Sequence, residues 1–471
     1  MGKHLIVFII NLYFLSDTKL LNYIKVASKL FQWGINLVRY DILVIGGGAT
    51  GVFTALDLTL RGLNVALVER GMIASGTSGK FHGMLHSGAR YATNDPDSAK
   101  ECIQENQIIS SIAPHSVIDT GGLFVAIEKP DLEFEETFIK GLKENGIPFK
   151  NVTKEDVLKL EPNINPGIKD AIWVPDKVVH AMDLIMSAAL TAALNGATFY
   201  TFREVVDFIK INNKIEGVKV YNRIKDRLEE IDADIIINSA GPWSAKILSK
   251  AGIKFDMLPT LGAMGVINKK LNSHILNRMR PPSDGDIIVP YSDNISIVGT
   301  TASIIEDVDN ASISQDDIDL LISEGSVMIP KIKELGFIRT YYSIRPLLKE
   351  STSNQITGRT ATRTFSIFDH ENDGLYGLLT ISGGKLTTAR LMGEKIGDYI
   401  SNKINLKKDS KTRNIKLVDK IDKENAEYLS QITGLNYSFI KGIIDFIGSV
   451  DEERIRPFIS MILTYGFGQV M

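Results

Sequence analysis

Short apolar runs alternate along the chain with segments of helical periodicity. Tyr40–Gly47 and Asn64–Glu69 have the continuous apolar character of buried strands. Ala49–Arg61 between them has helical spacing and ends at Gly62. These three segments predict a strand–helix–strand unit, and residues 235–238 and 377–381 predict two further buried strands.

Helix-start signals mark other segments. Asp95-Pro96 predicts a helix that runs to about Ile112, and Thr153 followed by two acids predicts another. Residues 205–211 and 215–221 read as two strands joined by Asn212-Asn213-Lys214, which predicts a hairpin. The pattern also predicts helices over 183–194, 315–327 and 386–404, strands within 287–298, and a long loop over 71–88. Buried strands, crossover helices and a hairpin together predict an α/β fold with a second, mixed sheet.

The two ends of the chain differ from this core. The apolar run Leu5–Leu15 is too short to cross about 30 Å of hydrocarbon as a helix. Residues 1–39 fit a poorly ordered extension best, with an amphipathic membrane-surface segment or a signal peptide as alternatives. Residues 405–421 are rich in Lys and predict a linker, followed by short helices over 422–471.

Composition limits the classes of function. The chain has 471 residues, 44% hydrophobic and 23% charged, which is typical of a globular protein. A net charge of −3 gives no reason to expect a nucleic-acid partner. Cys102 is the only cysteine, so a disulfide or a four-cysteine metal or iron–sulfur site within the chain is excluded. Redox chemistry would therefore need a bound organic cofactor or a partner.

A glycine fingerprint follows the first strand. Gly46, Gly48 and Gly51 have the G-x-G-x-x-G spacing at the start of a helix, and Glu69 ends the second strand. The glycines allow a tight turn, close approach of a pyrophosphate and close helix packing, and Glu69 can accept from ribose hydroxyls. This motif does not separate NAD from FAD. A second glycine turn, Gly383-Gly384, precedes another helix and favours the longer FAD.

Basic and polar residues occur beside these glycine loops. They are His82, His86, Arg90 and Tyr91, then Arg345 and Arg363, and finally Lys385. Each alone is more often a surface or structural residue, but their place near the predicted cofactor indicates a site for an anion such as a phosphate.

Several segments resemble FAD-dependent glycerol-3-phosphate dehydrogenases, most closely the large catalytic subunit of the anaerobic type. The resemblance covers residues 40 to about 404. It is carried by ASGTSGKFHGMLHSGARYATNDPDSAKECIQEN at 74–106, NSAGPW at 238–243, VGTT at 298–301, YSIRPL at 342–347 and SGGKLTTARL at 382–391.

The resemblance implies a Rossmann-like FAD-binding domain interleaved with a mixed-sheet substrate domain. The implied division is 1–39 as an N-terminal extension, 40–110 with 165–255 and 345–404 as the FAD-binding domain, 111–164 with 256–344 as the substrate domain, and 405–471 as the linker and helical C-terminal segment.

The resemblance also implies which reaction the protein catalyses and which residues take part in it. sn-Glycerol 3-phosphate would be oxidised to dihydroxyacetone phosphate by hydride transfer from C2 to flavin N5. Arg345 and His86 would act at the reacting carbon, with Arg90, Tyr91, Arg363 and Lys385 on the substrate phosphate. FAD would contact Gly46, Gly48, Gly51, Glu69, Arg70, Thr77, Ser78, Gly83, Met84, Val205, Ala240, Gly241, Gly384, Lys385, Leu386 and Thr387.

Some features depart from the family pattern. Met264 stands where some members carry a His, so either His86 or a water could be the base. A VDPxRL-like segment at 179–184 has lost its acid and its Arg. A related FAD oxidoreductase of 2-hydroxy acids or amines, or a flavin-bound scaffold without turnover, therefore stays open as an alternative.

The resemblance further implies where the electrons go. They would pass to quinone or to a partner protein, because the chain has no cysteine-rich relay of its own. We expect a cytoplasmic protein peripheral to the inner face of the cell membrane. Leu5–Leu15 and Ile459–Phe467 are the apolar segments that could make the membrane or partner contact.

Overall fold

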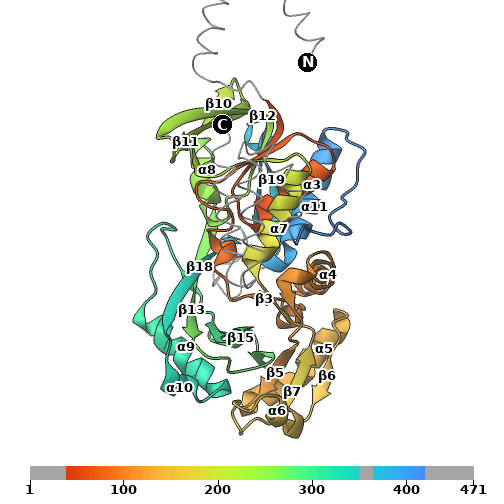
Figure 1. Ribbon diagram of the computed structural model, residues 1–471, viewed down its shortest axis with the longest axis vertical. Coiled ribbons are helices and arrows are strands. Elements are labelled where there is room, and N and C mark those ends of the chain that lie inside the picture. The colour runs from red at the N-terminus through yellow and green to blue at the C-terminus, as the bar shows by residue number, and fades with distance from the viewer. Residues whose placement is uncertain (1–38, 350–363, 420–471) are drawn as a thin grey trace, which may run out of the picture.

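The computed structural model describes residues 39–349 and 364–419, which form two large sheets with helices packed on them (Figure 1). In the first sheet β1 lies between β2 and β12, and both pairings are parallel. Ile45 pairs with both Val68 and Asn238, so the three strands end together at one edge. The strands of this sheet are β10 (Arg203–Ile211), β11 (Lys214–Asn222), β12 (Arg227–Asn238), β1 (Tyr40–Ile45), β2 (Val65–Val68), β9 (Thr198–Tyr200), β20 (Leu378–Gly383) and β19 (Phe365–Asp369).

Helix α3 (Ala49–Leu60) packs between α7 (Ala181–Leu194) and α11 (Ala389–Lys403). Their apolar faces join the strands in one buried cluster. Ten of the twelve residues of α3 are buried, among them the polar Thr54, Asp57 and Thr59, so the helix is covered on nearly all sides. This packing fixes the N-terminus of α3 at the edge where β1 ends.

The second sheet occupies the lower half of Figure 1. β13 and β18 pair antiparallel along their length, from Met257 opposite Leu348 to Val266 opposite Arg339. The strands are β17 (Ser303–Ile304), β13 (Met257–Ile267), β16 (Ile295–Gly299), β15 (Ile287–Ser292), β14 (Ile275–Arg278), β5 (Gly122–Ala126), β7 (Asp170–Val174), β6 (Lys150–Val152) and β18 (Arg339–Leu348).

Smaller elements surround and join these layers. A three-stranded sheet includes part of the segment 71–88, which the sequence predicted as a continuous loop, because Met84 and Leu85 form one of its strands. The remaining elements are β3 (Met84–Leu85), β8 (Lys177–Val179) and β4 (Val117–Ile118), with helices α4 (Pro96–Ile112), α5 (Lys129–Glu144), α6 (Lys154–Leu160), α8 (Ser244–Lys250), α9 (Gln315–Met328) and α10 (Ile332–Leu335).

The α/β fold class predicted from the sequence is confirmed. The first strand–helix–strand unit is β1, α3 and β2, and β10 and β11 form the predicted hairpin. The predicted helix starts also have their caps, because the side chains of Asp95 and Thr153 accept hydrogen bonds from the backbone NH of Ser98 and Asp156. The pattern did not reveal β13, β18 or α5.

Some segments differ from their sequence expectation. The strand expected at 235–238 is the end of β12, whose polar first half pairs with β11 instead. β7 belongs to the second sheet, although the resemblance places residues 165–255 in the FAD-binding domain. Residues 405–419 do not run free as a linker: Thr412 and Leu417 are buried, and Thr412 accepts from Arg390 of α11. The domain boundaries themselves stay a prediction.

Other expectations lie outside the described residues. These are the extension at 1–38, the substrate residue Arg363, the helical segment at 420–471 and the apolar run Ile459–Phe467. Within residues 39–349 and 364–419, no helix is long and apolar enough to cross a bilayer.

Candidate active site

A cavity of about 830 Å³ lies where the two sheets meet. Its lining comes from the turn after β1, the loop after β2, β13, β18 and the turn after β20. The size falls in the range of roughly 300–1,000 Å³ that is usual for ligand pockets. Segments far apart in the sequence therefore converge on one site.

The β1–α3 turn forms one end of this cavity. Gly46 has φ +108°, and a Cβ there would lie 2.8 Å from the carbonyl oxygen of Ser239. A Cβ on Gly51 would lie 1.9 Å from the carbonyl oxygen of Gly46, so only glycine lets α3 start this close to β1. Gly48 and Ala49 bring the N-terminus of α3 to the cavity wall, a favourable place for an anion.

Glu69 holds the loops around this turn together. Its Oε2 accepts from the backbone NH of Gly47 at 2.7 Å and its Oε1 accepts from the NH of Gly71 at 2.8 Å. Burial of the carboxylate raises its pKa, although the two NH donors act in the opposite direction. Each carboxylate oxygen retains a further lone pair, so Glu69 can also accept from a ligand in the cavity that it lines.

The loop after β2 ties the two sheets to each other. Ser78 Oγ accepts from the backbone NH of Ala49 at 3.0 Å, which satisfies one free donor of the first turn of α3. Thr77 Oγ1 donates to the carbonyl oxygen of Ile344 in β18 at 2.6 Å. This loop therefore sets the distance between the glycine turn and β18.

A second contact between the sheets closes over the same end of the cavity. Asp309 accepts from Trp243 Nε1 at 2.6 Å, and Arg70 lies 4.4 Å from the centre of the Trp243 ring. Lys246 forms ion pairs with Asp307 at 3.0 Å and with Asp309. The resemblance assigns Arg70 to the cofactor, but the sequence did not reveal this cluster, because its members are far apart in the chain.

Arg345 lies on β18 at the centre of the site. Its Nη1 donates to the carbonyl oxygen of Thr301 at 3.0 Å, and its Nη2 donates to Thr300 Oγ1. The guanidinium lies over Gly262 of β13, where a Cβ would come within 2.6 Å of Nη2. Arg345 also lines the cavity, where its positive charge could stabilise a developing anion.

His86, Tyr91 and Lys385 form a row along the cavity wall. The rings of His86 and Tyr91 lie 5.3 Å apart, and Lys385 Nζ lies 4.7 Å from the centre of the Tyr91 ring. The backbone NH of His86 donates to Thr387 Oγ1, which holds the loop after β2 against the second glycine turn. Lys385 Nζ is buried without a hydrogen-bond partner among the described residues, and its charge also acts on the carboxylate of Glu101, where burial raises the pKa and Lys385 lowers it.

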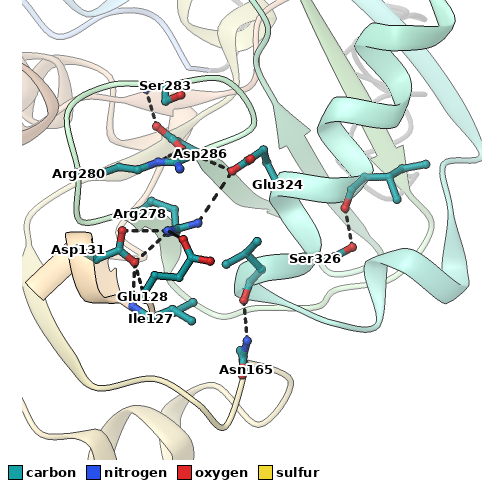
Figure 2. Close-up of polar contacts among 12 residues, drawn as sticks. Ile127, Glu128, Asp131, Asn165, Arg278, Arg280, Ser283, Asp286, Glu324 and Ser326 are labelled. Carbon is teal, nitrogen blue, oxygen red and sulfur yellow. Dashed lines mark hydrogen bonds and ion pairs between the residues drawn. The ribbon is translucent and has the colours of Figure 1, made fainter.

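Arg90 contributes another buried cation. Its Nη2 donates to the carbonyl oxygen of Ser283 at 3.0 Å and to Asp286 Oδ2 at 3.3 Å. Asp286 belongs to a larger set of ion pairs behind the cavity (Figure 2). The sequence did not single out Ser283 or Asp286, since neither carries a motif.

Most predicted site residues line this cavity, but not all. Gly51 lies beneath the turn, and Gly83 packs against Tyr291, 2.6 Å from where its Cβ would be. Neither lines the cavity, and Arg363 lies outside the described residues. The predicted residues that do line it are Gly46, Gly48, Glu69, Arg70, Thr77, Ser78, Met84, His86, Arg90, Tyr91, Val205, Ala240, Gly241, Arg345, Gly384, Lys385, Leu386 and Thr387.

Two other kinds of chemistry find no support in the described part of the chain. Cys102 is fully buried in α4, and burial raises the pKa of its thiol to about 11, which makes it a poor nucleophile. Residues 39–349 and 364–419 contain no group of three His, Cys, Asp or Glu side chains that could hold a metal ion.

Comparison with known proteins identifies the family. Residues 41–399 match the family model described as FAD dependent oxidoreductase, and the chain belongs to this family. It is 40% identical over 367 residues to one of the subunits of anaerobic glycerol-3-phosphate dehydrogenase in Escherichia coli (strain K12), covering 77% of this chain and 67% of that protein. The corresponding protein of Haloferax volcanii is 38% identical over 382 residues, covering 79% of this chain and 65% of that protein. The chain thus spans about two thirds of the length of these relatives.

Solved structures share the fold. A glycerol-3-phosphate dehydrogenase from Bacillus halodurans complexed with FAD aligns with a TM-score of 0.65 at 21% identity, covering 93% of this chain and 84% of that one. Glycine oxidase from Geobacillus kaustophilus aligns with a TM-score of 0.63 at 20% identity, covering 82% of this chain and all of that one. These two proteins are named for different substrates, so the shared fold does not show whether the substrate of this chain is a phosphate ester or an amine.

The residues present fit FAD. The glycine turn at the start of α3, with Gly48 on the cavity wall, would hold the pyrophosphate, and Glu69 on the same wall could accept from ribose hydroxyls. The second glycine turn, at Gly383 and Gly384, also contributes to the cavity wall. A cavity that reaches from one turn to the other matches a long dinucleotide better than a short ligand.

Proposed function

We propose that this protein oxidises sn-glycerol 3-phosphate to dihydroxyacetone phosphate. The observation that carries the proposal is the convergence of Arg345, Arg90 and Lys385 on the cavity that begins at the glycine turn. A dianionic phosphate would pair with both Arg90 and Lys385, whereas the carboxylate of an amino acid or a 2-hydroxy acid carries only one negative charge for the two cations. The 40% identity to the anaerobic glycerol-3-phosphate dehydrogenase protein of Escherichia coli supports the same substrate.

In this proposal the side chains divide the work between the two ends of the substrate. Arg90, Tyr91 and Lys385 bind the phosphate, and Arg345 stabilises the alkoxide that develops at the C2 hydroxyl. His86, which lines the cavity beside Tyr91, is the candidate base that accepts the hydroxyl proton. Bound FAD supplies the acceptor for the hydride that leaves C2.

Substrate comparison tests this proposal. The FAD-loaded protein is assayed with an artificial electron acceptor and with glycerol 3-phosphate, glycerol, a 2-hydroxy acid and glycine. We expect turnover of glycerol 3-phosphate with formation of dihydroxyacetone phosphate, and much less with glycerol, which lacks the anion. Preferential oxidation of the amine or the hydroxy acid would show that the substrate is wrong, and no turnover at all would favour a scaffold.

We further propose that the electrons pass to quinone or to a partner protein at the cytoplasmic face of a membrane. The relatives in Escherichia coli and Haloferax volcanii are each named as one subunit of an enzyme, which supports a partner. Fractionation of native cells, followed by assays with a quinone analogue and with oxygen, tests this. Rapid peroxide formation by a protein found only in the soluble fraction, with no quinone reduction, would contradict it.

A further inference from the structure

Asp286 is a buried carboxylate that holds two arginines at once. It has no exposed surface, and it directly precedes β15. Its Oδ2 accepts from Arg90 Nη2 at 3.3 Å, and its Oδ1 accepts from Arg280 Nε at 2.9 Å. One carboxylate thus joins an arginine that lines the cavity to another that lies behind it.

The loop before Asp286 adds a second hold on Arg90. The backbone NH of Ser283 donates to Asp286 Oδ2 at 2.6 Å, and the carbonyl oxygen of Ser283 accepts from Arg90 Nη2 at 3.0 Å. Figure 2 shows this loop folded back on Asp286. Among the described residues, both hydrogen bonds of the Arg90 side chain are made by Nη2, and Arg90 also lines the cavity.

The ion pairs behind Asp286 anchor it to two helices (Figure 2). Arg280 Nη2 reaches Glu324 Oε2 of α9 at 2.7 Å, and Glu324 lies 3.9 Å from Arg278. Arg278 in turn pairs with Asp131 of α5 at 2.9 Å. A buried pair keeps its geometry only when its remaining donors and acceptors are satisfied, and this network supplies them.

We propose that Asp286 is a positioning residue for the substrate phosphate: it fixes Arg90 so that its unused NH groups face the anion. This inference rests on the proposed function, and it adds a residue to it. An anion behind a phosphate site also repels the ligand, so a carboxylate kept there must give more to binding through its hold on Arg90 than it costs through repulsion.

A purely electrostatic role and a positioning role of Asp286 predict opposite changes in phosphate affinity for the same substitution. If Asp286 acted only through its charge, Asp286→Asn would remove a repulsion and tighten phosphate binding. If it positions Arg90, the same change weakens binding, because the neutral amide holds the guanidinium poorly and presents a donor in place of an acceptor.

The experiment has two measurements on FAD-loaded protein. The first is the KM and kcat for glycerol 3-phosphate, and the second is titration with inorganic phosphate followed by the flavin spectrum. For Asp286→Asn we expect a KM and a phosphate dissociation constant raised together by about tenfold or more, with kcat changed less. Asp286→Glu keeps the charge but displaces it by one methylene, and we expect an intermediate KM.

Glu161→Gln is the matched control. Glu161 is also buried and accepts from the backbone NH groups of Ser273 and His274, yet it neither lines the cavity nor belongs to the ion pairs around Asp286. Its substitution should lower the melting temperature while leaving KM within about twofold. An equal rise in KM for Glu161→Gln, or phosphate binding by Asp286→Asn as tight as in the unmodified protein, would overturn the proposal.

The proposal can also be tested if Asp286→Asn does not fold or if the protein does not oxidise glycerol 3-phosphate. If Asp286→Asn does not accumulate as folded protein, a KM of Asp286→Glu equal to that of the unmodified protein overturns the proposal, and a raised KM supports it. If the unmodified protein does not oxidise glycerol 3-phosphate, the proposed function is wrong, while the phosphate titration still decides whether Asp286 positions Arg90 for an anion.

Discussion

Arg345, Arg90 and Lys385 line the cavity, and each is held in a different way. Arg345 is anchored by neutral oxygens of Thr300 and Thr301, Arg90 by the buried Asp286, and Lys385 by no hydrogen bond within the described residues. We assign Arg345 to the reacting carbon and the other two to the phosphate. Substitutions should therefore separate chemistry from binding.

Arg345→Gln should slow the chemical step. The amide keeps part of the hydrogen-bonding capacity but loses the charge that stabilises the alkoxide, so the rate of flavin reduction at saturating substrate should fall by about 10²-fold or more. Stopped-flow absorbance measures this rate. Arg339→Gln, an exposed change on the same strand, is the control, and equal rates for both variants would remove Arg345 from the mechanism.

Lys385→Gln should weaken binding instead. Loss of a charge-assisted contact of about 1.5–3 kcal/mol corresponds to a KM raised about tenfold or more. Steady-state kinetics with glycerol 3-phosphate measures it. Lys395→Gln, an exposed change on α11, should leave KM unaltered. An unchanged KM for Lys385→Gln would show that the phosphate lies elsewhere.

At the scale of elements, the β1–α3 turn is the most constrained part of the site. A Cβ on Gly51 would lie 1.9 Å from the carbonyl oxygen of Gly46, so the helix can accommodate an alanine only by moving away from the strand. The anion site at the start of α3 depends on that distance. The turn can therefore be tested without touching a charged group.

Gly51→Ala should yield protein that loses FAD. We expect purified variant with little flavin absorbance and a lower melting temperature than the unmodified protein. Gly167→Ala is the control, since a Cβ there meets only the side chain of Asn165, at 3.0 Å. Full flavin content in Gly51→Ala would mean that close packing of β1 and α3 is not required.

The sequence predicted the elements whose pattern is local. β1, α3 and β2 are buried almost throughout, and the cap of α4 is a single Asp-Pro pair, so a short window contains the whole signal. β18 was missed because Arg345 and Pro346 interrupt its apolar pattern to serve the cavity. Asp286, Asp307 and Asp309 could not be found, since only tertiary packing brings them to the site.

At the scale of the whole molecule, the cavity joins the two sheets, so a ligand there should stabilise both. Two contacts around the cavity, between Asp309 and Trp243 and between Thr77 and Ile344, join segments that belong to the two halves of the fold. The cofactor would therefore add to the contact between the two halves of the fold.

Removal of FAD should lower the stability of the entire chain. A ligand bound at one hundred times its dissociation constant adds about 2.7 kcal/mol to the free energy of unfolding. We expect the melting temperature of the stripped protein to fall and to recover when FAD is added. Recovery with NAD but not with FAD would contradict the family's cofactor in this chain.

The most direct test of the central claim is an anaerobic titration of the FAD-loaded protein with glycerol 3-phosphate, followed by the flavin absorbance. We predict that the oxidised flavin band disappears as substrate is added and that dihydroxyacetone phosphate forms in equal amount. A band that persists with glycerol 3-phosphate but disappears with an amine or a 2-hydroxy acid would contradict the proposed substrate and the assignment of Arg90 and Lys385 to a phosphate.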